Sequence, residues 1–269
     1  MSINMTTLIL KSWNVLHGVH EFNYAFSTSP VLIKYQSQRN LNQSLFSNYV
    51  QDENKRIYDL SQTIQKQLGN NCVMCLQEVP GDLLNLLKAE NPNYNCLSYK
   101  YSRQPKLKNL SGQLYNDQNE YLVTMIPTNF TVIKTNTIQF DDPGKACFVV
   151  ELGGFSIMNT HLSFGEARNK ALDQIFKYSS NKFALVGDMN MNPNEFKEYL
   201  KKSPFSNLIV HHTSEDTRKG AHNNGHIFTS KLDYYVAPKG INFRNVSVNQ
   251  NDDQSDHCLI TALIGGIPP

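Results

Sequence analysis

A carboxylate and a carboxamide two residues apart follow one of the most apolar segments of the sequence. Phe183 to Val186 is an apolar run with the length of one buried strand, and Gly187, Asp188 and Asn190 come directly after it. A carboxylate binds hard cations or polarises water, and a carboxamide beside it donates to phosphate oxygens. Taken alone, this pattern more often marks an ordinary turn, because Gly-Asp and Asn-Pro are common turn formers.

The same arrangement, an apolar strand next to a group that binds a cation or carries a proton, recurs along the chain. The groups are Asn14, Glu78, His161, Asp188 with Asn190, and Asp256 with His257, while Asp233 lies within a further expected strand. Each has an ordinary explanation by itself, since asparagines often end strands and a lone histidine is more often a satisfied core residue. Burying unpaired acids costs free energy, so we expect these groups to converge and satisfy one another.

Acids gathered at strand ends without an equal number of arginines predict a bound divalent cation. An all-oxygen ligand set favours magnesium, with manganese as the alternative, over zinc. Cys72 and Cys75 lack the second ligand pair of a zinc knuckle and are expected to be buried thiols. We expect a mobile polar loop over 213–225, with one histidine touching a ligand, because the histidines of this region are too unevenly spaced for a metal site: His211, His212, His222 and His226.

Hydrophobic spacing predicts the elements that position these groups. Apolar residues at three- and four-residue steps predict helices over 56–68, 82–89, 165–178 and 196–200, the second of them capped by Asp82. Apolar or alternating segments predict strands over 8–15, 72–76, 120–126, 131–140, 145–152, 155–162, 183–186, 231–236 and 258–264. Pro193 is expected to stop the strand that precedes it from continuing.

Two polar stretches leave alternatives open. At about 20–52, aromatic residues are scattered among Ser, Asn and Gln without apolar periodicity, which predicts a polar insertion. It forms either a wall or lid over the strand ends or a plain surface excursion. The stretch 94–108 interleaves aromatic and cationic residues, which suits a nucleic-acid surface and equally suits an exposed strand.

Composition indicates a single globular domain over residues 1–269. Hydrophobic residues make up 40% and charged residues 18% of the 269 residues, which fits a soluble protein with a substantial core and excludes a disordered chain. The net charge of +2 neither requires nor excludes a polyanionic partner. No apolar run approaches the roughly 20 residues that cross a bilayer. Because no signal peptide is recognised and the five cysteines suit a reducing compartment, we expect a cytoplasmic protein, with a non-classical secretion route left open.

Six motifs in order, from residue 13 to 257, resemble the pattern of the endonuclease/exonuclease/phosphatase (DNase I-like) superfamily. They are Trp13-Asn14, Gln77-Glu78, Thr160-His161-Leu162, Gly187-Asp188-Met189-Asn190, Leu232-Asp233-Tyr234 and Ser255-Asp256-His257. The resemblance implies an α/β fold, a four-layer α/β/β/α sandwich of two packed mixed sheets with helices outside. In motif style, the chain is most similar to the deadenylase-type nucleases.

The resemblance also implies which residues bind metal and substrate. Glu78 would be the principal magnesium ligand, and Asn14 and Asp256 would complete the metal shell. Asn14, His161 and Asn190 would contact the phosphate group of the substrate.

The implied catalytic set is His161, Asp188, Asn190, Asp233 and His257. Asp188 and Asn190 would position and polarise the attacking water. His257, oriented by Asp233, would transfer a proton or stabilise the pentavalent phosphorus. Whether Asp188 or His257 takes the proton from water stays open at this point.

Three functions follow as hypotheses. The first is a magnesium-dependent phosphodiesterase, a nuclease that hydrolyses a nucleic acid by attack of activated water, with no obligate protein partner. The second is a phosphodiesterase or phosphatase acting on a phospholipid or small-molecule phosphate, similar to sphingomyelinases or inositol-phosphate enzymes. The third is a catalytically silent binding module, whose signature would be a missing ligand residue, and none is missing from the sequence.

Overall fold

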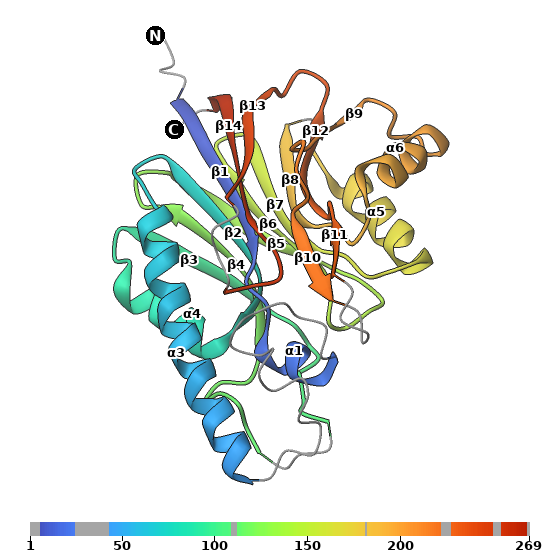
Figure 1. Ribbon diagram of the computed structural model, residues 1–269. Helices are drawn as coiled ribbons and strands as arrows, with labels where there is room; N and C mark the ends of the chain where they lie inside the picture. The colour runs from blue at the N-terminus through green and yellow to red at the C-terminus, as the bar shows by residue number, and fades with distance from the viewer. Residues whose placement is uncertain are drawn as a thin grey trace.

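Two six-stranded β-sheets packed face to face form the centre of the molecule, and helices lie on both outer sides (Figure 1). The computed structural model describes residues 6–24, 43–108, 112–180, 182–221, 227–249 and 254–267. The architecture is the four-layer α/β/β/α sandwich that the sequence motifs imply. No helix in these ranges is long and apolar enough to span a membrane.

The first sheet has the strand order β13-β14-β1-β2-β4-β3. Its strands are β1 (Thr6–Asn14), β2 (Cys72–Pro80), β3 (Tyr94–Lys100), β4 (Glu120–Pro127), β13 (Phe243–Asn249) and β14 (Leu259–Ile267). β1 pairs in parallel with β2 and antiparallel with β14. Helices α3 (Gln43–Gln67) and α4 (Gly81–Glu90) cover its outer face, and the short α1 (Gly18–Tyr24) follows β1 (Figure 1).

The second sheet has the strand order β5-β6-β7-β8-β12-β9. Its strands are β5 (Val132–Gln139), β6 (Ala146–Leu152), β7 (Phe155–His161), β8 (Phe183–Asp188), β9 (Leu208–His211) and β12 (Asp233–Pro238). Helices α5 (Glu166–Tyr178) and α6 (Pro193–Lys202) cover its outer face (Figure 1). The hairpin of β10 (Arg218–Ala221) and β11 (Ile227–Ser230) is a separate two-stranded sheet.

Three apolar layers hold the sandwich together. The middle layer combines residues of both sheets, such as Leu10 and Val73 from the first and Ile157 and Val186 from the second. The outer layers join each sheet to its helices. The central strands are therefore buried on both faces, which explains why they stand out in the sequence as short continuous apolar runs.

At one end of several strands, the next inward-facing positions after the apolar ones are taken by polar residues. In β8, Val186 belongs to the inner layer and Asp188 is the next residue on the same face. β1 and β7 end in the same way, at Asn14 and His161. β12 runs antiparallel to β8, so its first residue, Asp233, lies beside Asp188. Four strands thus place polar side chains at one end of the space between the sheets.

β2 reaches the same place through a β-bulge. Its register against β4 shifts between Leu76 and Val79, and Glu78 within the bulge has a φ of +56°. Regular alternation from Cys75 would give the inward position to Gln77. The bulge and the left-handed backbone re-aim the strand so that the Glu78 carboxylate points to the polar group as well.

A polar bridge from the second sheet stabilises the bulge. The Asn159 side chain on β7 donates through Nδ2 to the carbonyl groups of Leu76, at 3.1 Å, and Val123, at 2.9 Å. Its Oδ1 accepts a hydrogen bond from Gln77 Nε2 at 2.8 Å. Asn159 therefore satisfies buried backbone groups on β2 and β4 at the position where their pairing is interrupted.

The helix expected over 56–68 is longer than predicted. It begins at Gln43, and residues 18–24 form α1, so the described parts of the segment expected to be an irregular insertion are helical. Within 43–55, one buried position of the helix is taken by the charged residue Glu53, which interrupts the apolar spacing. Residues 25–42 of the expected insertion lie outside the described residues.

The cap predicted for α4 is wrong. The N-cap position is Pro80, which makes no side-chain cap hydrogen bond. Asp82 lies in the first turn and accepts hydrogen bonds from the backbone N–H groups of Asn116, at 3.0 Å, and Asp117, at 2.7 Å. It therefore anchors the neighbouring loop rather than the helix end.

Two further expectations need correction. The polar loop expected over 213–225 contains strand β10, and His222 and His226 lie outside the described residues. Pro193 does more than end a strand: it is the first residue of α6, after an Asn192 cap that forms a capping box with Glu195. Cys72 and Cys75 are buried thiols, as expected.

Candidate active site

All eight residues predicted from the sequence lie in one buried cluster at the end of the space between the sheets. They are Asn14, Glu78, His161, Asp188, Asn190, Asp233, Asp256 and His257. They come from six segments, in or next to strands of both sheets, and the convergence expected from the sequence is therefore present.

Asn14 joins the two carboxylates that come from different sheets. Its Nδ2 donates to Glu78 Oε1 at 3.1 Å and to Asp188 Oδ2 at 3.2 Å. Its Oδ1 accepts from the backbone N–H of Leu16 at 3.0 Å, which fixes the orientation of the amide. In this orientation the amide nitrogen of Asn14 links the two carboxylates, and its oxygen faces the backbone of Leu16. Its role as a metal ligand stays a prediction.

Glu78 is held as an anion. Its Oε2 accepts from the backbone N–H of His17 at 3.1 Å. Burial raises the pKa of Glu78, but His20, His161 and Lys145 lower it by more, so the net pKa lies well below the usual range of a glutamate. The carboxylate is ionised at every pH at which the protein would work.

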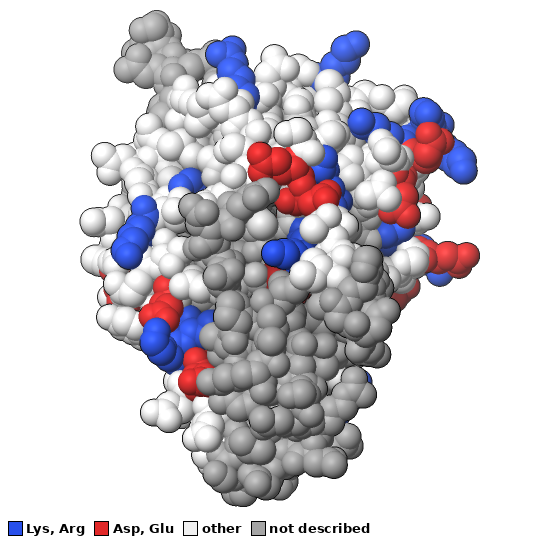
Figure 2. Space-filling model, viewed as in Figure 1, with Lys and Arg blue, Asp and Glu red and all other residues white. Residues whose placement is uncertain are grey.

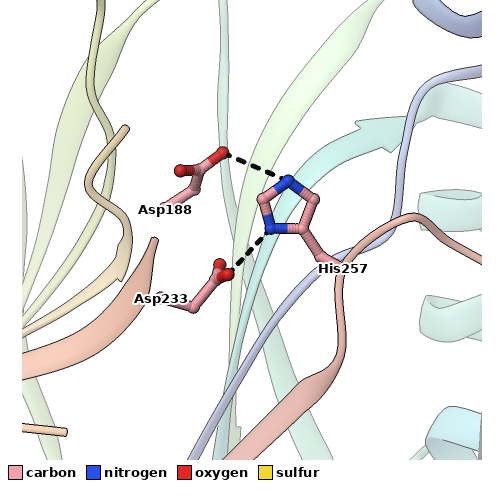
Figure 3. Close-up of side chains that lie close together, drawn as sticks. All are labelled: Asp188, Asp233 and His257. Carbon is pink, nitrogen blue, oxygen red and sulfur yellow. Dashed lines mark hydrogen bonds and ion pairs between the residues drawn. The ribbon is translucent and has the colours of Figure 1, made fainter. Parts of the chain in front are cut away.

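His257 lies between Asp233 and Asp188 (Figure 3). Its Nδ1 is 2.8 Å from Asp233 Oδ2, and its Nε2 is 3.6 Å from Asp188 Oδ2. Burial lowers the pKa of His257, but Asp233, Asp256 and Asp188 raise it by more, to about 10. The ring therefore carries protons on both nitrogens at neutral pH, and Nε2–H points toward Asp188.

Thr217 fixes the Asp233 carboxylate that His257 contacts. Its Oγ1 donates to Asp233 Oδ2 at 2.7 Å and accepts from the backbone N–H groups of Leu232 and Asp233, both at 3.0 Å. Hydrogen-bond partners of this kind set the orientation and basicity of the carboxylate that they hold. Sequence reasoning placed Thr217 in a mobile loop and so missed this contact.

Asp188 has a raised pKa, in contrast to Glu78. Burial raises the pKa to about 6, even though His257 lowers it. Asp233 adds a further negative charge nearby, which also raises it. The carboxylate is mostly ionised at pH 7 and takes up a proton just below that.

Asn190 reaches the cluster through a turn, not along the strand. β8 ends at Asp188, and Asn190 has a φ of +48°. Its backbone N–H donates to Asp188 Oδ1 at 2.9 Å, and its Nδ2 donates to the carbonyl of Leu162 at 2.7 Å. Strand alternation therefore delivers Asp188 to the cluster, and the turn after it places Asn190 against Asp188.

Asp256 is paired with an arginine that the sequence did not single out. Its Oδ2 accepts from Arg218 Nε at 3.0 Å, while Oδ1 is 4.0 Å from His257 Nε2. Burial lowers the pKa of Arg218, but Asp256 raises it by more. One oxygen of Asp256 is therefore taken by a cation of the protein, which leaves Oδ1 for any metal contact.

Lys145 is the second cation that sequence reasoning missed. Its Nζ is 2.5 Å from His161 Nε2, and that nitrogen lies 3.4 Å from Asp188 Oδ2 and 3.7 Å from Glu78 Oε1. Burial lowers the pKa of His161 well below its usual value, and Lys145 lowers it further, so the ring is neutral. Lys145 precedes β6, whose first residue, Ala146, pairs with His161.

The donor set fits a divalent cation next to Glu78. Asp188, Asp233 and His257 offer ligand atoms within 4.8 Å of one another, and Nδ1 of His257 already contacts Asp233. Glu78 and Asp188 supply carboxylates that share Asn14, and an all-oxygen set of this kind is what magnesium prefers. Among the described residues, Asp233 Oδ1 and Asp256 Oδ1 are further buried carboxylate oxygens without a hydrogen-bond partner.

Comparison with solved structures defines the fold. An endonuclease/exonuclease/phosphatase from Bacteroides vulgatus superposes with a TM-score of 0.64 at 15% identity, covering 96% of this chain and 98% of that one. D. rerio TDP2, complexed with a single-strand DNA product, gives 0.62 at 15% identity and covers 96% and 99%. A mannosyl-6-phosphatase from Bacteroides thetaiotaomicron gives 0.62 at 14% identity and covers 95% and 99%. No family model and no curated protein matches the sequence. The chain has the endonuclease/exonuclease/phosphatase fold.

Proposed function

We propose that the protein is a divalent-metal-dependent phosphodiesterase that hydrolyses phosphodiester bonds of a nucleic acid. The observation that carries this proposal is the pairing of an ionised Glu78 with a protonated His257, on either side of Asp188. A cation site and a proton donor then face the same small volume. Phosphoryl transfer needs both, because negative charge develops on the phosphoryl oxygens in the transition state.

The residues of the chain divide the reaction between them. Asp188, ionised at neutral pH, takes the proton of the attacking water as the P–O bond to the leaving oxygen breaks, and the leaving oxygen takes up a proton from solvent. His257 donates Nε2–H to a phosphoryl oxygen, while Asp233 holds its Nδ1–H and so stabilises the charged ring. Lys145 and the neutral His161 contact another phosphoryl oxygen from the opposite side. A magnesium ion held by Glu78 would neutralise charge on the phosphate, and Asn14 keeps the Glu78 carboxylate next to Asp188.

Nucleic acid as the substrate is supported by the motif style of the sequence and by the similarity to TDP2 complexed with a DNA product. The two cations at the site, Lys145 and Arg218, suit a polyanionic chain that runs past the reacting phosphate.

A second candidate is a phosphatase or phosphodiesterase acting on a small-molecule or lipid phosphate. Two observations favour it. The similarity to a mannosyl-6-phosphatase has the same TM-score, 0.62, as that to D. rerio TDP2. On the face shown in Figure 2, the Lys and Arg side chains of the described residues are scattered, some of them beside Asp and Glu side chains, and do not form a continuous basic stripe.

Turnover of different phosphate esters tests both candidates. The purified protein is incubated with poly(A), an abasic-site duplex, sphingomyelin and a sugar phosphate, each with magnesium and with a chelator. We expect metal-dependent cleavage of a nucleic acid, abolished in His257→Ala. Cleavage of only the sugar phosphate or sphingomyelin would replace the first candidate by the second. Equal turnover by wild type and His257→Ala would contradict both.

A further inference from the structure

Arg56 is a buried arginine, outside the catalytic cluster, whose side chain uses all of its N–H donors. Nε and Nη2 donate to Glu53 Oε2 and Oε1, at 2.8 and 2.7 Å. Nη1 donates to the carbonyl groups of Val15, at 2.9 Å, and Gln254, at 2.6 Å, and Nη2 also donates to that of Leu16, at 2.7 Å. A guanidinium group has five N–H donors, so none is left over, although the residue is only 2% exposed.

The three carbonyl groups belong to two segments that carry catalytic side chains. Two of them directly follow Asn14 in the chain. The third, that of Gln254, precedes Ser255, whose Oγ donates to the carbonyl of Asn14 at 2.6 Å and accepts from the backbone N–H of His257 at 3.1 Å. Arg56 therefore donates hydrogen bonds to both segments, the one that follows Asn14 and the one that precedes His257. It does so from helix α3, which itself supplies no member of the cluster.

The surroundings of Arg56 indicate a fixed geometry. Leu16, whose carbonyl it holds, has a φ of +57°, in the region that favours glycine. Glu53 also accepts from the hydroxyl of Tyr115 at 2.5 Å, and that hydroxyl accepts from the backbone N–H of Gly18 at 2.8 Å. A Cβ at Gly18 would lie 2.6 Å from the Tyr115 hydroxyl and 2.7 Å from Glu53 Oε1, so the packing leaves no room for a larger residue.

We infer that Arg56 is a positioning residue for the hydrolysis, which fixes the Asn14 and Glu78 side of the site relative to the His257 and Asp233 pair. The inference rests on the proposed function. Stability alone does not require an arginine here, because a buried ion pair is often no more stabilising than apolar residues of the same volume. Only a planar guanidinium supplies bonds in fixed directions to three carbonyl groups of two segments at once.

Two variants test the inference, with one matched control. The double variant Glu53→Gln/Arg56→Met removes both charges and nearly conserves volume, while Arg56→Lys keeps the charge and loses the planar set of donors. Lys55→Ala is the control, since Lys55 is the preceding residue of α3 and its side chain is 74% exposed. We expect kcat on the cleaved phosphodiester to fall by about 10- to 100-fold in both Arg56 variants, with a smaller change in KM, and to stay unchanged in the control.

Histidine side-chain NMR gives a readout that needs no activity. The Nδ1–H of His257, hydrogen-bonded to Asp233, is expected at low field in the wild type and is identified by its absence in His257→Gln. Loss or broadening of this signal in the Arg56 variants, with the signal retained in Lys55→Ala, supports the inference even if the wild type hydrolyses none of the substrates. A folded Arg56 variant with wild-type kcat and an unchanged His257 signal overturns it. Unfolding of both Arg56 variants also overturns it, because the residue then serves stability alone.

Discussion

The two sides of the site use the same kind of residue, a buried carboxylate in or at the end of a strand, in opposite electrostatic states. On the side of β1 and β2, the pKa of Glu78 is lowered well below its usual range. On the side of β8 and β12, the pKa of Asp188 is raised to about 6. Burial acts in the same direction on both groups, so their neighbours decide the outcome. The charged neighbours of Glu78 all lower its pKa. For Asp188, His257 lowers the pKa, but the second acid, Asp233, opposes it and adds to the effect of burial.

Because their pKa values differ, the two carboxylates suit different roles at the site. A carboxylate that never takes up a proton suits a permanent ligand for a cation. A carboxylate with a pKa near 6, next to a protonated histidine, suits proton transfer near neutral pH. The same principle, pairs of titratable groups with pKa values pushed apart, assigns acid and base roles in many enzymes.

Neutral replacements on each side should give the largest effects and should separate the two roles. We expect His257→Gln to lower kcat by about 10² to 10⁴-fold with magnesium affinity almost unchanged, because it removes the proton donor. Glu78→Gln should lower activity by a similar factor, on the order of 10³-fold, and should also weaken magnesium binding. Calorimetric titration with magnesium, beside steady-state kinetics, measures both. Unchanged magnesium affinity in Glu78→Gln would contradict the assignment of Glu78 as the ligand of the cation.

A smaller effect is expected from the residue that orients the Asp233 carboxylate. Thr217→Val removes the hydroxyl that donates to Asp233 Oδ2, so the carboxylate is free to rotate away from His257. We expect kcat to fall by about 10- to 100-fold with little change in magnesium affinity. Thr217→Ser keeps the hydroxyl and should retain most activity. Equal kcat values for the Val and Ser variants would show that this hydrogen bond does not support catalysis.

Magnesium binding should depend on pH through Asp188. Its pKa is raised to about 6 in the folded protein, so below that pH the site loses a negative charge next to the cation. The apparent affinity for magnesium should therefore fall between pH 7 and pH 5. In Asp188→Asn, affinity is weaker throughout but should vary less over this range. A wild-type affinity that is constant from pH 5 to pH 7 would contradict the raised pKa.

The smallest expected effect concerns His20, which helps to keep Glu78 ionised. Burial lowers the pKa of His20, but Glu120, 2.7 Å away, and Glu78 raise it by more. Because the folded-state pKa is the higher one, this contribution to stability is full below about pH 6.5 and is lost as pH rises through the folded-state value. His20→Gln should therefore cost about 1 kcal/mol at pH 5.5 and less at pH 9 in urea unfolding. A larger cost at pH 9 would reverse the assigned sign.

The sequence alone was sufficient to predict those site residues that stand last among the inward-facing residues of a strand. Asn14, His161 and Asp188 each follow an apolar run, and the same alternation that buries the run delivers the polar residue to the site. Lys145 and Arg218 have no such signal, because Lys145 stands before a strand and Arg218 begins a short hairpin strand. Their positions depend on which strands pair. Pairing between distant segments cannot be predicted from the spacing of apolar residues within one segment.

The helix α3 shows a second limit. Its first part contains the buried Glu53, and a charged residue at a buried position interrupts the apolar periodicity that predicts a helix. The orientation of Asn14 was also beyond sequence reasoning, since it depends on one hydrogen bond from the backbone of Leu16. Polar groups that satisfy one another in the interior become visible only with coordinates.

The Asn159 bridge has a consequence for motion within the sandwich. The contacts of the apolar layers have no fixed direction, whereas the three hydrogen bonds of Asn159 do, so they specify one position of the sheets relative to each other. A shear of the sheets would leave these polar groups without hydrogen-bond partners. It would also move apart the site residues that the two sheets each contribute. Heating should therefore remove hydrolysis and tertiary structure in one step, without a folded but inactive form in between.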